Sequence, residues 1–428
     1  MIIAHLRTFV GGFRELFARQ PRLALFPLVA VATSGFGQTF YLSVFGGELR
    51  SAFSLSHTAY GGLYSGATVV AAMLLLRLGP LADRWPLGRV VNLALAALIL
   101  GCLFIGLAPG GPTSGGVASG GLASGIWLLG LGFVLIRFGG QGFIAHLGMT
   151  AAARYFPAAR GRAVSLGAMG IPLAEALLPP VAVFLMTIGG WRFPWLAGAL
   201  LLLLVVLPLL RYLSRGAPLP AEFAEGKGPA KTVSRQFDRN QVLRDRGFYR
   251  LLPAVLITPF VATAVLFHQA AIADFQGWPL TLLAGAFVLF AAGHLLSLAL
   301  SGPLVDGLGA ARVLPLALLP MAGGQLLLAL FSGSWVPFAY LPLLGASIGM
   351  ATTAGGTLWA DRYGVLHLGA IRSLVHSAII VATAVAPIIA GLILDSPWKV
   401  PALAGGMAGL TLLSAALAVS VPPAAAAE

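Results

Sequence analysis

The pentapeptide GPLAD at positions 79–83 returns as GPLVD at positions 302–306, 223 residues later in a chain of 428. Each copy follows a long apolar run, and we expect each to begin a short charged loop. The same loop at matching positions in two apolar halves indicates one membrane unit that is used twice. Internal symmetry of this kind favours a carrier in which one half rocks against the other.

The composition is that of a membrane protein built from helices. Hydrophobic residues make up 58% of the chain and charged residues 9%, far from the balance of a soluble domain. The apolar runs reach the length of about 20 residues that a helix needs to cross a bilayer, whereas a β-barrel would show alternating runs of about ten. We therefore predict an all-α membrane protein with twelve transmembrane helices, at roughly 23–46, 57–78, 90–108, 125–148, 162–187, 192–213, 249–273, 280–301, 312–332, 336–359, 369–393 and 400–421.

The 26 lysines and arginines are unevenly distributed over the two sides of this topology. With a cytoplasmic N-terminus, 22 of them fall on the cytoplasmic side, only Arg50, Arg192 and Lys399 fall on the other, and Arg137 lies within the membrane. This is the positive-inside pattern, so we expect an integral inner-membrane protein with both termini in the cytoplasm. The net charge of +13 forms no compact basic module, which argues against a nucleic-acid partner.

Two segments outside the spans organise the chain. Residues 1–22 place apolar side chains along one helical stripe with arginines nearby, which predicts an amphipathic helix in contact with membrane lipid. Residues 214–248 are polar and basic, so we expect a cytoplasmic linker between six-helix halves at 23–213 and 249–428. Cys102 is the only cysteine and no phosphate-binding loop occurs, so we expect no metal, no cofactor and no enzymatic activity.

The loop after the second span resembles a motif of the major facilitator superfamily. The residues that resemble this family's Gly-x-Leu-Ala-Asp-Arg-x-Gly-Arg loop are Gly79, Asp83, Arg84, Gly88 and Arg89. Those that resemble its weaker second copy are Gly302, Asp306, Gly309 and Arg312. The run 137–142 is similar to the family's Arg-x-x-Gln-Gly motif. The resemblance covers nearly the whole chain and implies twelve helices in two pseudo-symmetric halves of six.

The sequence departs from the family patterns in ways that bear on the substrate. The first loop is two residues longer than usual, and the run 167–172 only loosely resembles the glycine-proline motif of the family's antiporters, which Glu175 does not continue. The chain is loosely similar to bacterial carriers of monocarboxylates and oxalate. However, its eighth and eleventh spans lack the mid-membrane Arg or Lys that those carriers use for carboxylates. The motifs therefore imply a carrier and say little about its cargo.

The resemblance also implies two latches that join the halves on the cytoplasmic side. Asp83 is expected at the start of span 11 near Arg372, and Asp306 at the start of span 5 near Arg162. A helix N-terminus carries unpaired N–H groups and a positive dipole end, which stabilise a carboxylate by roughly 0.3–1 kcal/mol. The alternative is that both acids are ordinary loop residues paired with neighbouring arginines.

Two formally charged residues lie deep within predicted spans: Arg137 in span 4 and Glu175 in span 5. Each alone would cost about 3 kcal/mol or more in hydrocarbon, so we expect them to form a charge-assisted pair. In one interpretation, Arg137 binds an anionic substrate group in a central cavity and Glu175 takes up a proton. In the other, the pair only braces the first half.

Weaker candidates are polar residues on spans that line the cavity in this superfamily, where they either contact substrate or bond to a neighbouring helix. They are Gln38, Tyr41, Gln141, His268, Gln269, Thr352, Thr353 and Thr357. His294 and His376 either relay protons or are satisfied between helices.

These features predict a monomeric secondary active transporter that moves a small-molecule substrate by alternating access, coupled to protons. We favour an organic anion because Arg137 is the one cationic side chain that we place at cavity depth. One alternative is efflux of a hydrophobic or cationic compound, with Glu175 as the main site. Another is a membrane assembly factor or sensor that keeps the fold without transport.

Overall fold

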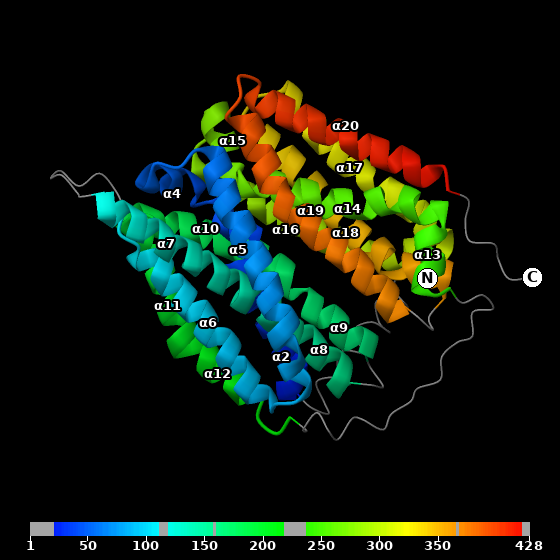
Figure 1. Ribbon diagram of the computed structural model, residues 1–428, viewed down its shortest axis with the longest axis horizontal. Coiled ribbons are helices and arrows are strands. Elements are labelled where there is room, and N and C mark those ends of the chain that lie inside the picture. Colours follow the sequence, from blue (N-terminus) through cyan, green and yellow to red (C-terminus); the bar gives the residue numbers. More distant parts are fainter. Residues whose placement is uncertain (1–20, 111–118, 157–159, 218–236, 365–367, 422–428) are drawn as a thin grey trace, which may run out of the picture. The chain divides into compact units, whose positions relative to one another are not determined.

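The computed structural model describes residues 21–110, 119–156, 160–217, 237–364 and 368–421, and the regular elements in these ranges are all helical (Figure 1). Twelve helices in the described ranges are long and apolar enough to cross a membrane, which confirms the predicted class and span count. The predicted surface helix at 1–22 falls outside the described residues, apart from the last two, which begin α2.

The chain divides into two compact units: residues 1–42 with 67–227, and residues 43–66 with 228–428. The elements of the first unit are α2 (Pro21–Thr33), η1 (Ser34–Gly37), α3 (Thr39–Ser43), η2 (Gly79–Asp83), α6 (Leu87–Leu107), α7 (Ser119–Ile136), η3 (Arg137–Ile144), α8 (Ala145–Tyr155), α9 (Arg160–Ala168), α10 (Gly170–Gly189), α11 (Arg192–Leu201), η5 (Leu202–Val206) and α12 (Leu207–Leu213). The last residue of α3 already belongs to the second unit, and helix α5 (His57–Leu78) begins in the second unit and ends in the first.

The second unit contains the other helices, including a short one that follows the first span. They are α4 (Gly46–Phe53), α13 (Arg239–Arg244), α14 (Arg246–Phe267), α15 (Gln269–Gln276), α16 (Leu280–Leu308), α17 (Ala310–Leu330), α18 (Val336–Tyr363), α19 (Leu368–Leu394) and α20 (Lys399–Val419). Helix α15, where we expected the end of span 7, is separate from α14 and packs on α4 (Figure 1).

Glycines set the close packing within each unit. In the first unit, a Cβ at Gly101 on α6 would lie 2.6 Å from the side chain of Ile136 on α7. In the second, α16 crosses α18 where a Cβ at Gly349 would lie 2.6 Å from the His294 carbonyl oxygen. Lipid tails are as apolar as the side chains, so helices in a membrane associate through such close contacts rather than through the hydrophobic effect.

Two helices of the first unit are irregular where they meet. The first span is interrupted by the 3₁₀ turn η1, and α7 continues into the π-helical segment η3. Gly37 and Gly140 allow these segments to touch, because a Cβ at Gly140 would lie 2.9 Å from the Gly37 Cα. Segments of π-helix recur at functional sites. The Arg-x-x-Gln-Gly run at 137–142 therefore coincides with a local distortion of the helix.

The two pentapeptides that reveal the repeat adopt different conformations. Residues 79–83 form the 3₁₀ turn η2, whereas residues 302–306 belong to the last turns of α16. The prediction that the second copy begins a loop is therefore wrong. The chain leaves that helix three residues later at Gly309, whose φ of +81° suits glycine because it has no Cβ.

Candidate functional site

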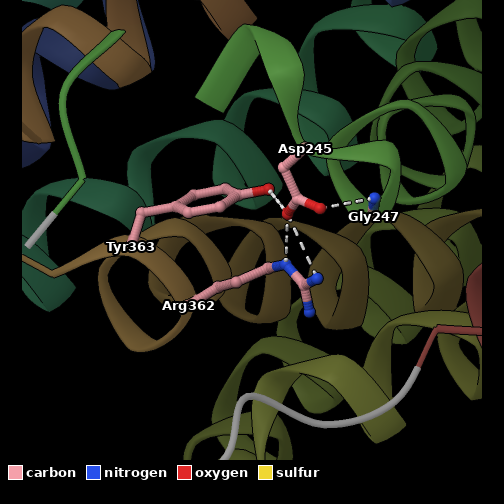
Figure 2. Close-up of polar contacts among 4 residues, drawn as sticks. All are labelled: Asp245, Gly247, Arg362 and Tyr363. Atoms are coloured by element: carbon pink, nitrogen blue, oxygen red, sulfur yellow. Dashed lines mark hydrogen bonds and ion pairs between the residues drawn. The ribbon is translucent and has the colours of Figure 1, made fainter. Parts of the chain in front are cut away.

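A group of polar side chains around Asp245 ties the start of α14 to the end of α18 (Figure 2). One carboxylate oxygen, Oδ1, accepts the backbone N–H of Gly247 at 2.8 Å and so caps α14. The other, Oδ2, accepts Nε and Nη2 of Arg362, each at 3.2 Å, and the Tyr363 hydroxyl at 2.7 Å. The carboxylate is thus held by four donors, two of them on a cation, which gives strong and oriented bonds.

These contacts keep Asp245 charged. Partial burial by itself raises the pKa of the carboxyl, but the Tyr363 hydroxyl, the Gly247 amide and the Arg362 guanidinium outweigh it, so the pKa lies below its usual value. The helix end is therefore anchored by an ion pair throughout the neutral pH range.

The sequence predictions did not include Asp245, Arg362 or Tyr363, although a repeated sequence pattern points to the last two. The pattern Ala-x-Arg-Tyr occurs at positions 152–155 and again at 360–363, at the ends of α8 and α18. In the first unit, Arg154 Nη1 donates to the carbonyl oxygen of Ala82 at 2.9 Å, within the first GPLAD loop. The repeated arginine therefore anchors a loop in one unit and the start of a helix in the other.

A cavity of about 630 Å³ lies in the second unit between α14, α18 and α19. Its wall is mostly apolar, and its polar groups are Thr258, Thr352, Arg372 and His376. Arg372 and His376 lie four residues apart on α19, hence on one face, and both are exposed. An apolar wall with few polar groups is typical of a small-molecule site.

Arg137 and Glu175 are buried in the first unit, with 2% and 4% of their surface exposed. Arg137 Nη1 donates to the carbonyl oxygen of Gly37 at 3.0 Å, and its Nε donates to Thr68 Oγ1 at 3.2 Å. The guanidinium thus bonds the backbone at the point where the first span is interrupted.

The other candidates of the first unit differ in burial. Tyr41 is buried, and its ring meets those of Phe36 and Trp195 edge to face, with centroids 5.2 and 5.1 Å away. Gln38 and Gln141 are half-buried, beside the Gly37–Gly140 contact. Tyr41 therefore packs against two aromatic rings of its own unit.

Three candidate substrate-binding residues of the second unit make hydrogen bonds to groups of the same unit. His268 is buried and its Nε2 donates to the Pro387 carbonyl oxygen at 2.9 Å. Gln269 is fully buried and donates to the Tyr340 hydroxyl. Thr353 Oγ1 donates to the carbonyl four residues earlier at 3.2 Å, whereas its neighbour Thr352 lines the cavity.

The proposed latch residues are only partly described. The side chains of Asp83, Arg162 and Asp306 lie outside the described part of the chain. Arg84, Arg89 and Arg312 are exposed, and Gly79, Gly88 and Gly302 are half-buried. Among the described residues, no group of three His, Cys, Asp or Glu side chains could hold a metal ion.

Comparison with known protein families identifies the family to which this chain belongs. A family profile described as Major Facilitator Superfamily matches residues 27–293, more than half of its length. This chain belongs to that superfamily. It is therefore an integral membrane protein with twelve candidate spans in its described part, a secondary transporter of small solutes and not an enzyme. A search of curated proteins finds no match.

Solved transporters share this fold. A D-xylose-proton symporter superposes with a TM-score of 0.70 at 16% identity, over 94% of this chain and 98% of that one. The xylose transporter XylE from E. coli, in a partially occluded inward-open conformation, gives 0.67 at 16% identity, over 96% and 100%. The nucleoside transporter NupG gives 0.63 at 11% identity, over 94% and 98%. At these identities the similarity establishes the fold, and the cargo has to be inferred from this chain's own residues.

Proposed function

We propose that this transporter carries a small organic anion with an apolar portion, together with protons, by alternating access across the inner membrane. The supporting observation is the pairing of Arg372 and His376 on one face of α19 in an otherwise apolar cavity. A guanidinium presents a planar fork of donors that matches a carboxylate, and apolar walls accept a hydrocarbon portion. A sugar would need many more hydrogen-bonding groups than these walls offer.

In this proposal His376 makes anion binding depend on pH. The cationic form of this histidine, one turn from Arg372, adds a second positive charge beside the carboxylate. Binding of the anion and uptake of a proton then favour each other.

This proposal moves the anion site from Arg137 to Arg372. Arg137 is buried and bonds to Gly37 and Thr68, which supports the bracing role that we considered as its alternative. Glu175 remains a candidate proton acceptor in the first unit. In an E175Q variant, loss of proton-driven accumulation with retained substrate exchange would support that role, and retained accumulation would remove it.

The latches stay part of the proposal on the strength of the family resemblance. Arg372 would then pair with Asp83 in one conformation and with cargo in another. Because neutral Asn at Asp83 breaks the latch and leaves the cavity unchanged, D83N should shift the balance between inward- and outward-open forms without lowering ligand affinity. An accessibility assay that finds no shift would exclude the latch.

The cargo class is tested by a thermal-shift screen of the purified protein against small carboxylates, amines, sugars and drugs at pH 6 and pH 8. We expect carboxylates with a short apolar tail to raise the melting temperature, more at pH 6, because a ligand that binds only the folded state stabilises it. R372Q should weaken that binding about tenfold or more, while R211Q, at an exposed arginine of α12, should not. Stabilisation by amines or sugars and not by carboxylates would overturn the proposal.

A further inference from the structure

One threonine in the wall of the cavity between α14, α18 and α19 differs from its neighbours in its hydrogen bonding. Thr258 on α14 is 4% exposed, and its Oγ1 is buried with no hydrogen-bond partner among the described residues. A helical threonine often donates to a carbonyl three or four residues earlier, as Thr352 does to Ile348 at 2.7 Å. Because the described residues supply no such bond to Thr258, rotation about χ1 can exchange its hydroxyl with its methyl group and bring the hydroxyl into the cavity.

A proline places a hydrogen-bond acceptor beside this hydroxyl. Pro259, the next residue, also lines the cavity, and it has no N–H to donate to the Val255 carbonyl four residues earlier. That carbonyl points along α14 toward Pro259, and Val255 lines the cavity as well. A donor and an acceptor that lack their usual helical partners are therefore neighbours in the wall. One ligand hydroxyl can serve both, because it accepts one hydrogen bond and donates another.

Contacts among the three helices give the depth of this pair relative to Arg372. Arg372 Nη2 donates to the Gly356 carbonyl at 2.5 Å, so the guanidinium lies at that level of α18. A Cβ at the adjacent Gly355 would lie 3.9 Å from Val255 Cγ1, so Val255 lies at nearly the same level. Thr258 is three residues farther along α14, which is about 4.5 Å deeper at a rise of 1.5 Å per residue.

This spacing suits a carboxylic acid with a hydroxyl on its third carbon. The carboxylate can pair with Arg372 while the hydroxyl reaches Thr258 and the Val255 carbonyl. A hydroxyl on the second carbon stands directly beside the carboxylate and falls short of that level. Farther along the helices, apolar side chains of the wall can accept the rest of the carbon chain. They are Ala262, Ile348 and Ile379.

We propose that the cargo is a 3-hydroxy carboxylic acid with an apolar chain, whose hydroxyl binds between Thr258 and the Val255 carbonyl. The inference rests on the proposed function, because it adds a second contact to the same anion site. Thr258 and Pro259 then select the hydroxylated acid over its parent acid. A wall without this donor and acceptor would favour the parent acid, because a hydroxyl would lose its hydrogen bonds to water there.

The test compares hexanoate, 2-hydroxyhexanoate and each enantiomer of 3-hydroxyhexanoate by titration calorimetry on the purified protein in nanodiscs. The measured quantity is the Kd of hexanoate divided by that of the hydroxy acid, in which effects common to both acids cancel. We expect one enantiomer of 3-hydroxyhexanoate to give a ratio of about five or more, the size of a net hydrogen-bond gain. The ratio for 2-hydroxyhexanoate should not exceed one. A ratio of one or less for both enantiomers of the 3-hydroxy acid would overturn the inference.

T258V is the main variant, because valine keeps the shape of threonine and lacks the hydroxyl. It should lower the ratio for the 3-hydroxy acid to about one. P259A restores an N–H that can donate to the Val255 carbonyl, so it should lower the ratio as well. The matched control is T411V on α20, because Thr411 is buried, is not in the cavity wall and already donates to the Met407 carbonyl at 2.7 Å.

The variants can also contradict the assignment. An unchanged ratio in T258V or in P259A would overturn it, and so would an equal fall in T411V. A ratio that falls in T352V and not in T258V would move the hydroxyl contact to α18 and overturn the role of Thr258.

Other outcomes separate this inference from the proposed function. Hexanoate binding that R372Q weakens, with no preference for the 3-hydroxy acid, would sustain the anion site and overturn the hydroxyl contact. Failure of all the acids to bind would overturn both as stated. A preference for 1-aminohexan-3-ol over hexylamine that T258V abolishes would refute the anion site and sustain the hydroxyl contact.

Discussion

At the scale of single residues, arginines in this transporter act mostly through backbone and carboxylate bonds. Arg137 bonds the Gly37 carbonyl, Arg154 bonds the Ala82 carbonyl, and Arg362 bonds Asp245. A guanidinium has five donors and stays charged, so it can hold an interrupted backbone in place. Arg372 Nη2 also donates to a backbone carbonyl, that of Gly356 at 2.5 Å, but this side chain is exposed in a cavity, where its remaining donors can reach a ligand.

Neutralising Asp245 should destabilise the fold in a pH-dependent way. D245N loses charge-assisted bonds to Arg362 and Tyr363, for which we expect a loss of roughly 1–3 kcal/mol and a lower melting temperature at pH 7. Because the pKa of Asp245 is lowered in the folded state, this stabilisation is present above the usual carboxyl range and is lost as pH falls through the folded value. The gap between D245N and the parent should therefore close as the pH falls through the folded pKa of Asp245.

The control is D238N, at the capping residue of α13. Among the described residues, the Asp238 side chain accepts from the Gln241 backbone N–H at 2.8 Å, within a capping box that asparagine can largely keep. An equal loss in D238N, or a D245N gap that persists in acid, would show that the ion pair is not the cause.

A substitution at Gly247 tests the Asp245–Arg362 ion pair in a second way. A Cβ at this position would collide with the Arg362 guanidinium, whose flexible end has to move away from Asp245. G247A should therefore lower the melting temperature about as much as D245N does, although it changes no charge. The double variant should lose little more than either alone, because both remove one interaction. Additive losses would contradict this account.

At the scale of elements, the glycines decide which helices can be irregular. Segment η3 packs by Gly139 on α6 and by Gly140 on η1, whereas Gly142 has room. The π-helical segment is thus packed closely on two sides. This packing holds Arg137 in place for its bonds to Gly37 and Thr68.

Alanine substitutions in η3 should lower stability at glycines in close contact with another helix and have little effect at glycines with open space. A Cβ at Gly139 would lie 2.6 Å from the Ala94 carbonyl oxygen, so G139A should cost roughly 1–3 kcal/mol through overpacking. At Gly142 the nearest atom would be 3.4 Å away, and G142A should be nearly neutral. Melting temperatures in detergent test this. Equal effects would mean that η3 is free to shift.

At the scale of the whole molecule, the second unit holds a polar junction at each end of its helices. Asp245 lies at the start of α14, and Asp395 lies beyond the other end, roughly 33 Å away for a helix of 22 residues. There the Asp395 carboxylate accepts the backbone N–H groups of His57 and Thr58 and so caps α5. Hydrogen bonds hold the pKa of Asp395 below its usual value against the effect of partial burial, as they do for Asp245.

The two polar junctions, at Asp245 and at Asp395, should act independently on stability. Losses in melting temperature from D245N and D395N should add in the double variant, because sites this far apart share no partners. Non-additive losses would mean that the two sites are coupled through the helices of this unit.

The sequence by itself determined the fold class, the number of spans and the superfamily. These follow from the length and period of apolar runs and from the GPLAD and Arg-x-x-Gln-Gly motifs, which are local properties of the chain. The apolar runs alone also dictate helices, since hydrocarbon leaves no other way to satisfy the backbone. The latches and the role of Glu175 remain predictions.

Only the tertiary structure decided what the charged residues contact. The GPLVD copy is part of a helix, and Arg137 bonds a backbone carbonyl. Arg362 forms an ion pair with Asp245, which lies 117 residues earlier in the chain. The cap on α5 comes from Asp395, a residue near the other end of the chain. Hydropathy reports the depth of a residue but not which helix faces it, and the energy of a buried or capping charge depends on that neighbour.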